Sequence, residues 1–208
     1  MRLSSVQLNY LQGKKLYRNV LTWSDYYWPN STLVYSVGKG MTFSDYMSIM
    51  AAMSDISSQT CVRFRRTYDL KEPQVILQRT ELGCWSHIGY QGEKQTLNLG
   101  VGCMSQGIIQ HELLHALALL HMHNDPRRNQ FVKINLKNVR EDEKHNFQIY
   151  DSNDFNLGYD YDSVMHYGPY AFSRNGRPTI VPLQKGVKIG QRLGLSQKDV
   201  LKLKRIYC

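Results

Sequence analysis

Two histidines and a glutamate interrupt one nearly apolar segment, and this arrangement restricts the fold more than any other feature of the sequence. His111 and His115 are four residues apart, so a helix would place both imidazoles on one face, one turn apart. The surrounding run, residues 108–120, is almost entirely apolar, so we expect this helix to cross the interior. Its few polar side chains therefore need a function there.

The spacing fits a zinc site with three imidazole ligands. His121 follows His115 by six residues and can supply the third ligand if the helix ends just before it. Glu112 is placed to take a proton from the attacking water and to pass it to a leaving amine. The alternative is a helix with two hydrogen-bonded histidines and a salt-bridged glutamate. The third histidine and the downstream motif at residues 163–167 favour zinc.

Cysteine usage indicates the redox compartment. The four cysteines are Cys61, Cys84, Cys103 and Cys208. An even number without a CxxC pair favours two disulfides over a thiolate metal site, and the sequence alone leaves three pairings open. Four reduced thiols in a cytosolic protein are the alternative. We expect a secreted, extracellular protein, and a glycosylation sequon begins at Asn30.

Length and charge exclude two classes of protein. The chain has 208 residues, 42% of them hydrophobic, which is enough to bury a core, and it contains no apolar run of about 18 residues that predicts a membrane span. A formal net charge of +9 raises the possibility of nucleic-acid binding. The basic residues are scattered along the chain, so we interpret them as a solvated surface and expect no nucleic-acid partner.

Apolar periodicity predicts a strand-rich first half. Strands are expected at residues 33–37, 62–64, 74–77 and 95–99. A helix is expected after a capping box at residues 42–45. The residues expected on its core face are Phe43, Tyr46, Met47 and Met50.

The second half is expected to be mostly irregular. Asn135 is predicted to cap a helix that runs to about Phe147, and a turn-rich stretch follows at residues 151–194. A second capping box at residues 196–199 predicts a final helix. At the other end, residues 1–18 are expected to form a poorly packed leader, with a cleavage site after Arg18, which leaves the domain at residues 19–208.

Further motifs make the chain resemble the astacin family of metzincin metalloproteases from about residue 19 to residue 208. They are Trp28-Pro29, residues 83–86, Arg128 with residues 131–135, and residues 145–147, 159–161 and 163–168. The resemblance implies an α+β fold, a two-lobed zincin-like catalytic domain with a cleft. The N-terminal lobe would be a twisted, mostly parallel sheet with two long helices, and the C-terminal lobe would be largely irregular with a final helix.

The resemblance also implies roles for single residues. Tyr167 would bind zinc at rest and then swing to stabilise the oxyanion, for which a phenol has the required hydrogen-bond donor. A core aromatic residue is the alternative. Met165 would form a Met-turn beneath the zinc ligands. The implied disulfides join Cys61 to Cys208 and Cys84 to Cys103.

Substrate recognition is implied in the same way. A strand at Cys84, Trp85 and Ser86 would pair with an extended protein or peptide substrate. Arg192 resembles an arginine of the primed-side pocket in some relatives, so an acidic residue just after the scissile bond is expected. An ordinary surface arginine is the alternative. The implied activity is that of a secreted, zinc-dependent metalloendopeptidase.

Three of the departures from the family pattern bear on the zinc site. Ala118 replaces a glycine where the chain must turn through a left-handed residue, which costs a non-glycine residue about 1–2 kcal/mol. Met122 replaces a glutamate that tethers the freed N-terminus, and Lys14 stands where relatives carry a zinc-capping propeptide aspartate. These departures motivate an alternative, a weakly active or inactive binding protein. The presence of Glu112 and Tyr167 argues against it.

Overall fold

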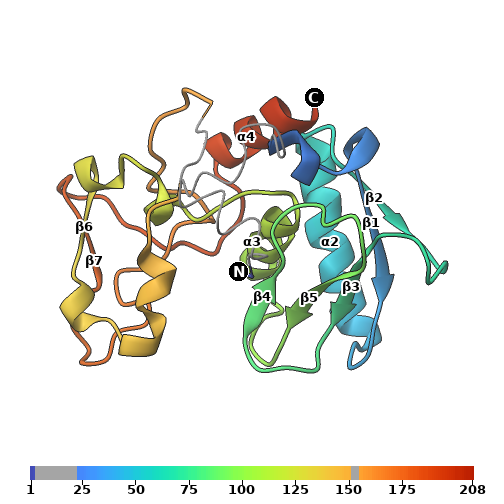
Figure 1. Cartoon of the computed structure of the whole chain (residues 1–208), viewed down its shortest axis with the longest axis horizontal. Helices are drawn as coiled ribbons and strands as arrows, with labels where there is room; N and C mark the ends of the chain where they lie inside the picture. Colours follow the sequence, from blue (N-terminus) through green and yellow to red (C-terminus); the bar gives the residue numbers. More distant parts are fainter. Residues whose placement is uncertain (3–22, 151–154) are drawn as a thin grey trace, which may run out of the picture.

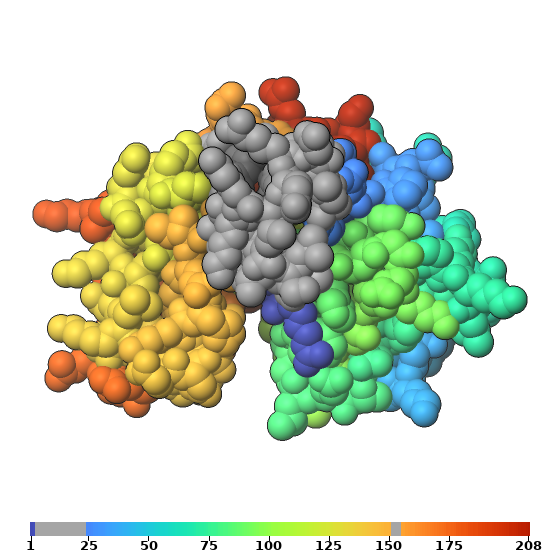
Figure 2. Space-filling model, in the orientation of Figure 1, coloured from blue at the N-terminus to red at the C-terminus, as the bar shows by residue number. Residues whose placement is uncertain are grey.

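Two lobes of different construction lie on either side of a groove (Figures 1 and 2). The computed structural model describes residues 1–2, 23–150 and 155–208. One lobe carries a five-stranded sheet with two helices, and the other is largely irregular around a two-stranded sheet. The mixed α+β architecture agrees with the fold class expected from the sequence.

The larger sheet is mostly parallel, with the strand order β2-β1-β3-β5-β4. Its strands are β1 (Thr32–Val37), β2 (Arg63–Arg66), β3 (Val75–Gln78), β4 (Cys84–Ser86) and β5 (Gln95–Leu99). Four of them match the expected strands to within about two residues. The fifth, β4, is antiparallel to β5 and forms the sheet edge that faces the second lobe (Figure 1). An edge strand in this position can accept another chain.

Helix α2 (Phe43–Gln59) begins at the expected capping box. The Asp45 N–H donates to Thr42 Oγ1 at 3.1 Å, and the Thr42 N–H donates to Asp45 Oδ2 at 3.0 Å. The predicted core face is wrong for Phe43 and Met47, which are 78% and 51% exposed, whereas Tyr46 and Met50 are partly buried against the core. The buried apolar residues of the helix are Ile49, Ala52, Met53 and Ile56. Apolar residues on two adjacent stripes made the phase of the helix ambiguous from the sequence.

Helix α3 (Gln106–Ala116) crosses the interior of the first lobe and contacts α2, β4 and β5. Residues 109–116 are all buried, including His111, Glu112 and His115. The helix ends earlier than the apolar run suggested, because Leu117 leaves the helical conformation and Ala118 has a left-handed φ of 73°. The chain then reverses and carries His121 back towards the helix.

The second lobe has its own apolar core around β6 (Val132–Ile134) and β7 (Ile180–Pro182). The predicted helix from Asn135 to Phe147 is wrong, because two short 3-10 segments, Leu136–Asn138 and Glu141–Phe147, replace it. The Asn135 side chain donates to the Pro178 carbonyl at 3.2 Å instead of capping a helix. The remaining 3-10 segments are Trp23–Tyr26, Pro29–Ser31, Met122–Asn124 and Arg128–Gln130.

Helix α4 (Gln197–Tyr207) starts at the second capping box, formed by Ser196 and Asp199 as expected. Two disulfides, Cys61–Cys208 and Cys84–Cys103, join the end of α4 to the segment before β2 and join β4 to the segment before α3. Of the helices that the structure describes, none has the length and apolar character needed to cross a membrane.

The expected leader lies almost wholly outside the described residues, and so do Lys14 and Arg18. Met1 and Arg2 are described, and they lie on the wall of the groove (Figure 2, dark blue). Arg2 pairs in parallel with His87, next to the end of β4. This part of the expected leader therefore packs against the first lobe.

Candidate metal centre and catalytic groove

Three histidine side chains from α3 and from the turn beyond it converge on one point. The Nε2 atom of His121 lies 3.1 Å from that of His111 and 3.0 Å from that of His115. Two ligand nitrogens of a tetrahedral zinc ion, each about 2.0–2.1 Å from the metal, are separated by roughly 3.3 Å. The observed spacing therefore fits three ligands of one ion, and in the described part of the chain these three residues form a group that could hold a metal.

Backbone carbonyls orient two of these rings. His111 Nδ1 lies 2.7 Å from the Val164 carbonyl oxygen, and His115 Nδ1 lies 2.8 Å from that of Leu119. A proton on Nδ1 leaves the Nε2 lone pair directed at the centre of the cluster. Burial lowers the pKa of His111 to about 3 and also lowers those of His115 and His121. Neutral imidazole is the form that binds a metal, so this donor set fits zinc.

The sharp turn after α3 depends on Ala118. Its φ of 73° lies in the left-handed region, where an alanine is strained by about 1–2 kcal/mol. Two hydrogen bonds close the turn, from the Ala118 N–H to the His115 carbonyl and from the Leu119 N–H to the Leu114 carbonyl, both at 2.9 Å. The left-handed conformation expected from the sequence is therefore present at Ala118.

Ala118→Gly is expected to raise the free energy of unfolding by about 0.5–1 kcal/mol. The substitution removes the strain, but glycine gains freedom in the unfolded chain, and this offsets part of the benefit. Urea unfolding at fixed zinc concentration would measure the change. Ala116→Gly, in helical backbone two residues earlier, is the matched control and should lower the stability by about 1 kcal/mol or more. An Ala118→Gly protein no more stable than its parent would show that the turn carries no such strain.

Glu112 lies next to His111 on α3, with 4% of its surface exposed. Its Oε2 atom has no hydrogen-bond partner among the described residues. Burial raises the pKa of Glu112 to about 7, against the opposing positive charges of the Met1 amino group and Arg192. A bound divalent cation would lower this pKa and so favour the ionised carboxylate that a general base requires. The carboxyl group is thus buried, and one of its oxygens has no partner in the described part of the chain.

Tyr167 enters the groove from the second lobe and packs on the third histidine. Its ring centroid lies 4.3 Å from that of His121 and 4.1 Å from that of His123. Burial and the nearby charge of Glu112 raise the pKa of the Tyr167 phenol. The phenol therefore stays protonated at physiological pH and keeps a hydrogen to donate.

Arg192 lies close to the start of α3. A Cβ atom at Gly107 would be only 2.1 Å from the Arg192 carbonyl oxygen, so the two segments can meet only at a glycine. The Nη1 atom of Arg192 donates to the carbonyls of His166 at 3.0 Å and Gln191 at 2.7 Å. Burial lowers the pKa of Arg192, and the negative charge of Glu112 opposes this shift.

Asp199 of α4 supports the metal centre, a role that the sequence interpretation missed. Its carboxylate accepts hydrogen bonds from Ser163 Oγ at 2.6 Å and from the Val164 N–H at 2.9 Å. Val164 in turn presents its carbonyl to His111, and Met165 donates its N–H to Ser163 Oγ at 3.0 Å. The only sequence signal for Asp199 was its capping box, which gives no hint of this distant contact.

Met122, which replaces the expected glutamate, is buried directly after His121. Its sulfur lies 2.9 Å from Lys202 Nζ of α4. A thioether cannot form the buried ion pair that a glutamate would make with a freed amino terminus. The family tether is therefore not possible in this chain.

Comparison with known proteins identifies the family of this arrangement. The family model described as Astacin, a peptidase family, matches residues 21–208. The chain belongs to the astacin family. Its metalloendopeptidase activity and its zinc cofactor follow from this membership together with the histidine cluster.

Individual relatives agree with the assignment. The chain is 41% identical to Seminal metalloprotease 1 of Drosophila melanogaster over 203 residues, which cover 91% of this chain and 81% of that protein. It is 39% identical to Zinc metalloproteinase nas-14 of Caenorhabditis elegans, again over 91% of this chain, but spans only 39% of that longer protein. A solved structure of High choriolytic enzyme 1, a hatching enzyme zinc-protease from Oryzias latipes, matches with a TM-score of 0.82, 35% identity, and coverage of 93% and 97% of the two chains.

Proposed function

We propose that this astacin-family member cleaves extended segments of other proteins, with Glu112 as the general base. His111, His115 and His121 would hold the zinc ion. The observation that carries the proposal is the Glu112 carboxylate, which is buried beside three converging neutral imidazoles and has an oxygen without a partner among the described residues. A buried carboxylate at such a site is costly to maintain unless it acts on a ligand.

Each residue of the site has its own role in peptide hydrolysis. Bound zinc would supply a Lewis acid that polarises the carbonyl and lowers the pKa of water to about 7. Glu112 accepts the proton of the attacking water and returns it to the leaving amine. Tyr167 donates a hydrogen bond to the oxygen that becomes negative as the carbonyl carbon turns tetrahedral. Met165, whose N–H donates to Ser163 Oγ, would form the turn beneath the ligands.

The outer side of β4 supports binding of an extended substrate. The Arg2 N–H donates to the Ser86 carbonyl at 2.7 Å, and the Ile88 N–H donates to the Arg2 carbonyl at 3.2 Å. This side of the strand thus already pairs with the backbone of one residue, Arg2. We propose that Cys84, Trp85 and Ser86 offer the same edge to a substrate, whose main chain would provide affinity.

The same proposal includes a residue preference just after the scissile bond and an extracellular location. Arg192, whose charge interacts with that of Glu112, would favour an acidic side chain just after the scissile bond. The two disulfides favour function outside the cell, where oxidising conditions preserve them.

Digestion of a broad peptide library tests the activity. We expect cleavage that a chelator stops and that added zinc restores, with acidic residues enriched directly after the cleavage site. A protein that carries one zinc ion per chain and cleaves nothing would contradict the proposal. That result would favour the alternative, a binding protein of the same fold, which the strained Ala118 and the replacement at Met122 motivate.

Tyr167→Phe is expected to lower kcat by about 10²- to 10³-fold, the range for loss of one hydrogen-bond donor to an oxyanion. The ring packing on His121 would be retained, so zinc content should not change. Steady-state kinetics with metal analysis would measure both quantities. Tyr170→Phe is the matched control, because Tyr170 is 58% exposed. A kcat within twofold of the parent would assign Tyr167 to packing alone.

A further inference from the structure

The first lobe offers a binding site for one basic side chain beside β4. We infer that Glu81 and the indole ring of Trp85 form a substrate subsite selective for arginine, and less strongly for lysine. The inference rests on the proposed function and deepens it, because it names a side chain of the substrate. In the structure Arg2 occupies this site. Its guanidinium carbon lies 3.4 Å from the centroid of the Trp85 ring, and its Nη2 lies 3.2 Å from Glu81 Oε2.

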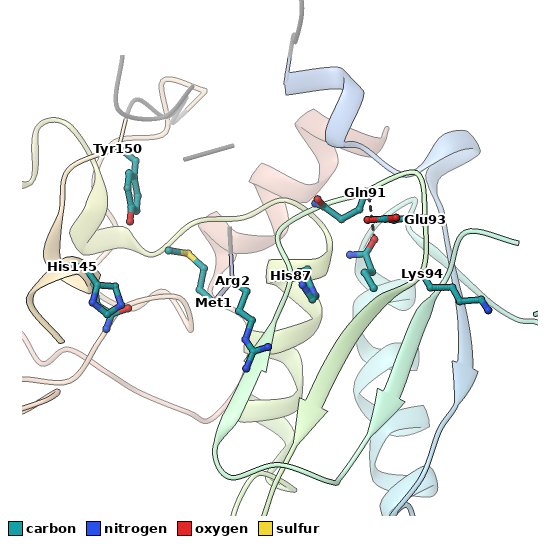
Figure 3. A pocket seen from close by; sticks show the side chains of 10 residues that line it. Met1, Arg2, His87, Gln91, Glu93, Lys94, His145 and Tyr150 are labelled. Atoms are coloured by element: carbon teal, nitrogen blue, oxygen red, sulfur yellow. Dashed lines mark hydrogen bonds between the residues drawn. The ribbon is translucent and has the colours of Figure 1, made fainter. Parts of the chain in front are cut away.

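Arg2, which occupies the site, also lines the groove between the lobes. A cavity of about 420 Å³ lies there, with His87 and Gln91 on the side of the first lobe and His145 and Tyr150 on the side of the second. Figure 3 shows Arg2 alongside β4, between His87 and the two residues of the second lobe. Since Arg2 both lines this cavity and stacks on Trp85, an extended peptide that pairs with β4 as Arg2 does would bring a side chain to the indole ring.

The backbone fixes the position of Glu81. The side chain of Asn98 is fully buried, and its Oδ1 accepts from the Glu81 N–H at 3.1 Å while its Nδ2 donates to the Glu81 carbonyl at 3.0 Å. Gly100 packs so closely that a Cβ atom there would lie 2.5 Å from the Glu81 carbonyl oxygen. Glu81 therefore presents its carboxylate from a backbone that does not need to rearrange on binding.

Trp85 is fixed just as firmly. It lies opposite Asn98 in the β4–β5 ladder, and its neighbour Cys84 is bonded to Cys103. Its ring also meets the His87 ring edge to face, with centroids 5.8 Å apart. Asn98 therefore sets the relative position of the indole and the carboxylate, since it pairs with both segments.

The Trp85 indole and the Glu81 carboxylate both recognise a guanidinium group, each from a different direction. A guanidinium stacks on an indole face and donates hydrogen bonds to a carboxylate in its own plane, whereas an ammonium lacks the planar surface. Glu81 is about half exposed, so solvent screens the ion pair and the preference should be moderate. We expect roughly a 5- to 20-fold higher kcat/KM for a peptide with arginine at this subsite than for one with citrulline.

Paired peptides that carry arginine or citrulline at each of three positions on either side of the scissile bond would test the subsite. The assay uses the zinc-loaded wild-type chain and an Arg2→Gln variant, in which the internal occupant has lost its charge. We expect the arginine preference at one position, and a larger preference in Arg2→Gln.

Variants of the subsite itself should change this preference. Glu81→Gln should reduce the ratio of kcat/KM between the arginine and citrulline peptides to below about twofold, and Glu81→Lys should favour a glutamate peptide. Trp85→Phe should keep more of the preference than Trp85→Leu.

Glu72→Gln is the matched control, since it makes the same charge change in a residue that pairs with Arg65 at the opposite edge of the sheet. This variant should leave the ratio of kcat/KM between the arginine and citrulline peptides unchanged. The inference is overturned if Arg2→Gln shows no arginine preference, or if Glu81→Gln retains it in full. If the zinc-loaded wild type cleaves none of the peptides, the proposed function itself fails, which is a distinct result.

Discussion

Replacing Glu112 by glutamine is expected to reduce kcat by about 10²- to 10⁴-fold, the usual contribution of a positioned general base. Glutamine has nearly the same shape as glutamate but cannot accept the proton of the attacking water. Substrate binding should change little, because the β4 edge and the subsites are untouched. The loss should therefore appear in kcat rather than in KM.

The measurement has to separate the loss of the base from the loss of the metal. Zinc content per chain and the circular dichroism spectrum should match the parent, since His111 and His115 keep their carbonyl partners in the variant. Glu141→Gln is the matched control, because the Glu141 side chain is 80% exposed and pairs with Lys144. A Glu112→Gln protein with full zinc and more than a tenth of the parental kcat would show that another group removes the proton.

The metal centre could be predicted from the sequence because its donors are local. His111 and His115 share a helix face, and His121 returns after a single turn, so spacing alone constrains the three nitrogens. The left-handed Ala118 could be expected for the same reason, since no helical path brings His121 back. Short-range geometry of this kind leaves few alternatives.

The support of the metal centre could not be predicted in this way. The Asp199 carboxylate contacts Ser163 and Val164, which lie more than 30 residues away in the chain. Neither the motif at residues 163–167 nor the capping box at residues 196–199 indicates from the sequence that the two are in contact. The partly misplaced core face of α2 has a similar cause, since burial of Ile49 rather than Phe43 depends on where the sheet lies. In the second lobe, the stretch up to Phe147 winds into 3-10 turns because its backbone groups find partners outside a regular helix, as Asn138 does with Arg174.

His121→Ala is expected to abolish zinc retention and, with it, the zinc-dependent part of the stability. The parent should gain about 2.7 kcal/mol when free zinc is 100-fold above its dissociation constant, whereas the variant should gain almost nothing at the same concentration. Two remaining imidazoles on one helix face leave the ion without the ligand that closes the site from the other side. Activity should fall below detection for the same reason.

Unfolding in urea with and without added zinc would measure this linkage, together with the zinc content after dialysis. The metal-free chains should stay folded, because two disulfides and two apolar cores do not depend on the ion. His145→Ala is the matched control, since His145 is exposed and pairs with a backbone carbonyl away from the cluster. If His121→Ala still gained the full stabilisation, a different third ligand would have to be present, and the turn at Ala118 would serve packing rather than the metal.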